Sequence, residues 1–99
     1  MIANGQKDIE MRLYDDKRKA IKIGDIIQFE NVENQEKLEV VVLNLYIFDN
    51  FEELYQRFDK TRLGYLKHEQ AFAKDMEQYY SKEAILKNKV IGIHIKVLK

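Results

Sequence analysis

The chain has 99 residues, and its 17 Lys and Arg residues balance its 17 Asp and Glu residues, so the formal net charge is zero. This length fits one domain over residues 1–99, and the neutral balance argues against avid, nonspecific binding to nucleic acid. Without cysteine there is no disulfide framework and no thiolate metal site, and no apolar run approaches the ~20 residues of a spanning helix. No secretory signal is recognisable. We therefore expect a cytoplasmic protein with no membrane association and no metal or other cofactor.

The first expected element is a helical turn over residues 1–4, closed by a glycine of the kind that ends helices. A strand over residues 8–14 follows, because apolar and polar side chains alternate strictly there. One face of this strand would pack into a core, and the other would carry Glu10 two residues from Arg12. Lys7 joins these charges from the preceding turn. This polar face is therefore the expected floor of a site.

Three further elements are expected in the first half of the chain. A polar turn over residues 15–19 precedes a strand over residues 26–30. A polar hairpin loop at residues 31–35 then leads to a long β-branched strand over residues 38–47. The apolar residues of this strand change phase after Val42, which indicates a bulge or a sharp bend of the kind found at barrel corners.

The second half of the chain favours helices and ends in a strand. Asp49 is expected to cap a helix, with Glu52 as its capping-box partner. The buried stripe of this helix would consist of Phe51, Leu54, Tyr55 and Phe58. A second helix is expected over residues 67–80, and Ser81 would cap one further helical turn. The core side chains of the second helix would be Phe72, Met76, Tyr79 and Tyr80. The last strand is expected over residues 90–98.

The first strand carries a signature that resembles a known family. Residues 5–12 match the pattern Gly-x-Lys-x-x-Glu-x-Arg of the ASCH domains, which belong to the PUA-like superfamily. Other segments resemble the small stand-alone bacterial members of the family, in the same order and spacing: residues 13–18, 23–29, 51–54, 75–81 and 90–93. The resemblance implies an α+β fold, a small PUA-like β-barrel of about five strands with two or three short helices.

The chain departs from these relatives before Gly5, where they usually carry a strand and a full helix. The resemblance therefore implies that the N-terminal strand of the family is missing. Loss of a barrel strand leaves an unpaired edge, which invites pairing with another chain. Formation of a homodimer, or aggregation, through this edge is one hypothesis, and a protein–protein interaction domain is one interpretation of the chain.

Five residues are candidates for a site that binds RNA, a nucleotide or a modified nucleoside: Lys7, Glu10, Arg12, Tyr14 and Tyr80. Arg12 would donate a fork of hydrogen bonds to a phosphate or a base edge. Lys7 would supply positive charge, Glu10 would accept from an amino group, and the two rings would stack on bases. The alternative is a Glu10–Arg12 ion pair on a solvated strand face, with both tyrosines in the core. The resemblance to the ASCH domains favours the ligand site.

Whether the protein is an enzyme stays open. One branch of similar small bacterial proteins hydrolyses N4-acetylcytidine with a Lys, a Thr and a Glu. Lys7 matches this lysine, but Glu10 stands where the threonine is expected, and no residue is assigned to the third role. The second interpretation is therefore a small hydrolase of an acylated nucleoside or of RNA. Glu10 would act as general base on water, and Lys7 would stabilise the developing oxyanion.

Overall fold

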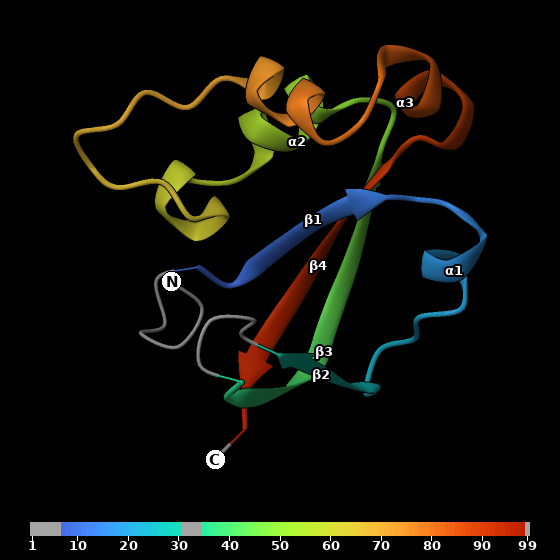
Figure 1. The fold of residues 1–99 in the computed structure, drawn as a ribbon, viewed down its shortest axis with the longest axis vertical. Coiled ribbons are helices and arrows are strands. Elements are labelled where there is room, and N and C mark those ends of the chain that lie inside the picture. The colour runs from blue at the N-terminus through green and yellow to red at the C-terminus, as the bar shows by residue number, and fades with distance from the viewer. Residues whose placement is uncertain (1–6, 31–34, 99) are drawn as a thin grey trace.

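The computed structural model describes residues 7–30 and 35–98. Within these residues, four strands form one antiparallel sheet in the order β1-β4-β3-β2 (Figure 1). Their bounds are Ile9–Leu13 for β1, Ile26–Glu30 for β2, Lys37–Phe48 for β3 and Val90–Val97 for β4. The fold is α+β and half-barrel-like, as the resemblance implied, with four strands in the described residues where about five were expected. The helical turn expected at residues 1–4, and the question of a missing strand before it, lie outside the described residues.

The bulge expected in the long strand is confirmed. β3 pairs with β4 from Val40 to Phe48, and the register shifts between Val42 and Asn44. The extra residue lets the apolar side chains before and after it face the same way despite the change of phase. A bent β3 can therefore pair with β2 at one end and reach the helices at the other (Figure 1).

The sheet packs on both faces, so β4 is buried almost throughout. On one face, β1 and β4 pack against the helices in a cluster of nine buried residues: Ile9, Met11, Leu13, Phe51, Leu54, Phe58, Leu63, Met76 and Val90. On the other face, β3 and β4 form a second cluster: Val40, Val42, Ile91, Ile93 and Ile95. Gly92 belongs to the first face, where an added Cβ would lie 3.3 Å from Ile9 and 3.5 Å from Leu54. The absence of a side chain there lets α2 approach the sheet.

Two helices begin differently from the sequence prediction. The turn expected at residues 15–19 forms one turn of helix, α1 (Asp16–Lys19), because the Asp15 side chain accepts a hydrogen bond from the Arg18 amide. Helix α2 (Phe51–Arg57) is capped by Asn50, and its partner is the glutamate at position 53. That glutamate accepts from the Asp49 amide at 3.3 Å. The predicted capping box is thus displaced by one residue.

The helix predicted over residues 67–80 is wrong. The segment contains only the 3₁₀ helix η3 (Ala73–Gln78) and follows a shorter one, η2 (Lys60–Leu63). Of its four expected core side chains only Met76 is buried, whereas Phe72 is 55% exposed and Tyr79 is 68% exposed. A helix needs a continuous apolar stripe against the core, and these residues do not supply one.

The end of the chain follows the prediction. Helix α3 (Lys82–Asn88) begins after Ser81, whose hydroxyl accepts from the Ala84 amide at 3.1 Å. It leads directly into β4, so α2 and α3 lie together at the end of the sheet where β3 ends and β4 begins (Figure 1). No helix in the described part of the chain is long and apolar enough to cross a membrane.

Candidate functional site

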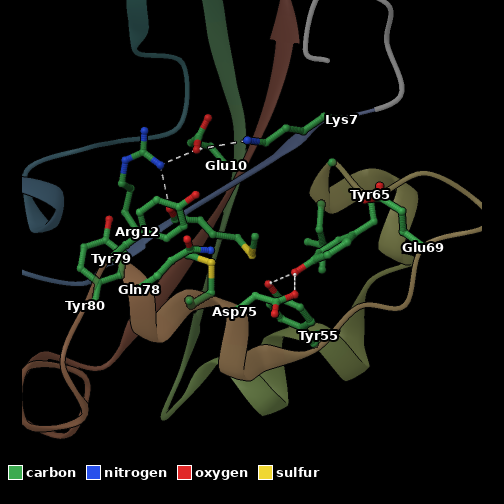
Figure 2. A pocket seen from close by; sticks show the side chains of 14 residues that line it. Lys7, Glu10, Arg12, Tyr55, Tyr65, Glu69, Asp75, Gln78, Tyr79 and Tyr80 are labelled. Atoms are coloured by element: carbon green, nitrogen blue, oxygen red, sulfur yellow. Dashed lines mark hydrogen bonds and ion pairs between the residues drawn. The ribbon is translucent and has the colours of Figure 1, made fainter.

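A buried carboxylate on β1 holds two cations. Glu10 is only 6% exposed, and its Oε1 lies 3.5 Å from the Nζ of Lys7. The same oxygen accepts a hydrogen bond from the Nη1 of Arg12, which also donates to the Met11 carbonyl at 2.8 Å (Figure 2). The alternation of β1 places Glu10 and Arg12 on one face, and Lys7 reaches them from two residues before the start of the strand.

This cluster retains unused positive charge. Glu10 balances only one of its two cations, so Lys7 and Arg12 together leave an excess of one charge. Arg12 donates through Nη1 alone, and its Nε and Nη2 find no acceptor among the described residues. Its side chain is 32% exposed. A fork of charged N–H donors is therefore open to an anion or to a hydrogen-bond acceptor.

The cluster borders a pocket of about 660 Å³. Residues from both faces of β1 line it, since Glu10 and Arg12 lie on one face and Met11 on the other. Because β1 is an edge strand of the sheet that the described residues form, the pocket extends around the outer edge of β1. The opposite wall comes from α2, the segment after η2, and η3 (Figure 2).

Lys7 is held by its contact with the segment after η2. Gly64 ends η2 with a φ of +105°, and an added Cβ there would lie 3.2 Å from the Cδ of Lys7. The segment is fastened to the start of β1, because Arg62 donates to both carboxylate oxygens of Asp8 at 2.8 and 3.1 Å. The Nε2 of His94 lies 3.2 Å from the same carboxylate. These links fix the floor on which the Lys7 side chain lies.

Two tyrosines and an aspartate form a chain of hydrogen bonds on the opposite wall. Tyr65 donates to the Oδ2 of Asp75 at 2.8 Å, and its oxygen lies 2.8 Å from the hydroxyl of Tyr55. Since Tyr65 has one proton and gives it to Asp75, Tyr55 is the donor of the second bond. Burial raises the pKa of both hydroxyls, and the bonds to Tyr55 and Asp75 raise that of Tyr65 further. The Tyr55–Tyr65–Asp75 chain is therefore fully protonated at its hydroxyls near neutral pH.

The structure brings four of the five predicted site residues together. Lys7, Glu10, Arg12 and Tyr80 all line the pocket. Tyr14 does not, because it lies at the far end of β1, packs against the second core cluster and has the Nζ of Lys19 5.6 Å from its ring centroid.

The aromatic side of the pocket differs from the sequence prediction. One face of the Tyr80 ring stacks on Phe51, with centroids 6.0 Å apart and planes at 14°. Tyr79 also lines the pocket and is 68% exposed, so it offers the more accessible ring. The alternative interpretation put Tyr14 and Tyr80 in the core. Both are partly buried and pack against the core clusters, and Tyr80 also lines the pocket.

Sequence reasoning missed the opposite wall altogether. Tyr55 was assigned to the core stripe of a helix, and Tyr65 and Asp75 were given no role in the site. Their meeting depends on η2 and η3, which no periodicity indicated. Among the described residues, no three His, Asp or Glu side chains are arranged to hold a metal ion.

The ASCH domain model matches residues 1–97, and the chain belongs to the ASCH domain family. The crystal structure of hypothetical protein PH0355 is similar, with a TM-score of 0.83 and 33% identity over 98% of this chain and 87% of that one. The solution structure of protein PF0455 from Pyrococcus furiosus has a TM-score of 0.69 and 32% identity over 95% of this chain and 83% of that one. No curated protein matches the chain.

Proposed function

We propose that this protein binds RNA or a nucleotide in the pocket beside β1. The observation that carries the proposal is the meeting of Lys7, Glu10, Arg12 and Tyr80 around one cavity, with free guanidinium donors facing it. The association of ASCH domains with RNA binding supports the same reading.

The residues divide the work by their chemistry. Arg12 and Lys7 would hold a phosphate or a carbonyl, because Glu10 positions both cations and cancels the charge of only one. The exposed ring of Tyr79, beside Tyr80, would stack on a base. With zero net charge on the whole chain, affinity would come from these local contacts and not from a general attraction.

The test is fluorescence anisotropy of a labelled single-stranded RNA, measured as a function of salt. Arg12→Ala should weaken binding and lower the slope of log K against log salt by about 0.7, the value for one phosphate contact on a single strand. Lys96→Ala is the matched control, since this lysine is an exposed strand cation that does not line the pocket. Equal losses from both variants would show a nonspecific electrostatic effect and would contradict the proposal.

A hydrolase is the second candidate. The observation in its favour is that the Nζ of Lys7 lies 3.5 Å from the buried Glu10 carboxylate, within reach of a shared water. Incubation with N4-acetylcytidine, followed by chromatography for cytidine, tests it directly. Glu10→Gln and Lys7→Ala should then abolish product. Intact N4-acetylcytidine after long incubation with the wild-type protein would exclude this substrate.

We propose that two copies of the chain associate through β2, the sheet edge that does not border the pocket. β1 borders the pocket, so β2 is the edge at which a second copy can pair without closing the site. Ile23 and Ile26, beside that edge, are 63% and 61% exposed. Light scattering should give the mass of a dimer, reduced in Ile26→Lys. A monomer mass at high concentration would refute this arrangement.

A further inference from the structure

The two walls of the pocket differ in charge. Lys7 and Arg12 lie on the β1 side, with Glu10 between them. Glu69 and Asp75 line the opposite side, with no cation among the described lining residues there (Figure 2). A ligand that is anionic at one end and donates hydrogen bonds at the other would be oriented by this difference.

Asp75 is the acceptor best prepared to receive a ligand. Its Oδ2 accepts from Tyr65 at 2.8 Å, and its Oδ1 has no partner among the described residues. By contrast, Glu69 is turned to its own loop, where it accepts from the Leu66 amide at 2.7 Å. A carboxylate with a free oxygen in a pocket can only accept, so it selects groups that carry N–H or O–H.

The hydrogen-bond chain fixes the direction in which Asp75 points. Tyr55 comes from α2, Tyr65 follows η2, and Asp75 lies in η3, so the chain joins three elements. The two rings also meet edge to face, with centroids 5.8 Å apart. Because both hydroxyl protons are committed within the chain, neither tyrosine is free to offer its proton to a ligand. Neither of these hydroxyls therefore competes with Asp75, and the remaining donors on this side of the pocket belong to Gln78, Tyr79 and Tyr80.

We propose that this wall reads the base of a bound nucleotide and selects one that carries an amino group. The inference rests on the proposed nucleotide-binding function, with the phosphate at Arg12 and Lys7 and the base across the edge of β1. Asp75 accepts from the amino group of cytosine, as carboxylates do in base recognition. The corresponding edge of uracil presents a carbonyl oxygen, which the carboxylate repels. Guanine also differs from hypoxanthine by one amino group, which hypoxanthine replaces with a hydrogen and not with a carbonyl oxygen.

The experiment measures the affinities of two matched pairs of nucleoside 5′-monophosphates by calorimetry. Cytidine and uridine monophosphates form one pair, and guanosine and inosine monophosphates the other. Wild-type protein should bind the amino-bearing member of at least the pyrimidine pair about tenfold tighter, the effect of one hydrogen bond to a charged acceptor. Asp75→Asn should remove or reverse this preference, because the Asn amide can accept from Tyr65 and then turns a donor to the pocket. Asp16→Asn, at a fully exposed carboxylate elsewhere, is the control.

A second variant distinguishes the loss of one hydrogen bond from unfolding of the protein. Tyr65→Phe keeps the ring and removes the bond that aims Asp75, together with the bond that Tyr65 accepts from Tyr55. It should reduce the preference while thermal unfolding stays cooperative. Equal affinities for both pyrimidine nucleotides, each lowered alike by Arg12→Ala, would overturn base selection and leave nucleotide binding standing. A preference that survives Asp75→Asn would also overturn it. Binding of none of the four nucleotides would overturn it together with nucleotide binding.

Discussion

The glycine beneath Lys7 offers a sharp test of how the pocket is built. Gly64 has a φ of +105°, and an added Cβ would lie 3.2 Å from the Cδ of Lys7. Gly64→Ala therefore does two things. It strains the backbone, and it pushes the Lys7 side chain away from Glu10.

The strain can be sized from the backbone conformation. An L-residue in the left-handed region costs about 1–2 kcal/mol. For a domain of this length, that lowers the midpoint of thermal unfolding by about 5–15 °C. The contact with Lys7 is closer than the usual 3.5–4.0 Å between carbons, and the flexible side chain relieves it by moving. Loss of one partly exposed charge contact should lower RNA affinity by about twofold to fivefold.

A second glycine supplies the control. Gly24 has a φ of +94°, and an added Cβ would meet nothing within 4 Å. Gly24→Ala should therefore lose similar stability and keep full affinity. Circular dichroism during heating gives the stability of each variant, and anisotropy with labelled RNA gives the affinity. The reasoning is refuted if Gly64→Ala binds RNA as tightly as Gly24→Ala, or if it unfolds at the wild-type temperature.

Three further outcomes follow from the same contacts. The pKa values of Tyr55 and Tyr65 are raised above the ordinary 10.0 in the folded protein, so the unfolded chain releases these two protons at lower pH. The free energy of urea unfolding should therefore fall above about pH 10, and these two groups should not change it below that pH. A Tyr65→Phe variant with an unchanged alkaline profile would count against this. Arg62→Ala breaks the partly exposed bridge to Asp8 and should lose about 1 kcal/mol in urea unfolding, and a loss below experimental error would mean that the bridge does not fasten η2. Ser81→Ala removes the cap of α3 and should lose about 1 kcal/mol with RNA affinity unchanged, so a large fall in affinity would show that α3 contributes to the site.

The strands could be predicted from the sequence because a strand that packs on one face shows a local pattern of apolar and polar residues. The alternation of β1, the phase change in β3 and the apolar face of β4 each reflect burial on a pleated surface. The polar pattern around β1 also predicted that Lys7, Glu10 and Arg12 lie together, as they do in the structure. Charges two residues apart on one strand, such as Glu10 and Arg12, lie on the same face whatever the rest of the chain does.

The opposite wall could not be predicted, for a physical reason. Tyr55, Tyr65 and Asp75 are each ten residues apart along the chain, and they meet only because η2 and η3 turn where a regular helix was expected. Short 3₁₀ helices have no periodicity long enough to recognise. Tyr14 failed in the opposite way. It shares the polar face of Glu10 and Arg12, but the lining of the pocket along β1 ends at Arg12.

The central claim is that the pocket beside β1 is the ligand site. The measurement that tests it most directly is a titration of isotope-labelled protein with cytidine monophosphate and a short single-stranded RNA, followed by amide and side-chain chemical shifts. The account predicts shifts that saturate and concentrate at Lys7, Glu10, Arg12 and Tyr80, with Tyr14 unaffected. Saturable shifts confined to another surface, or none at millimolar ligand, would contradict it.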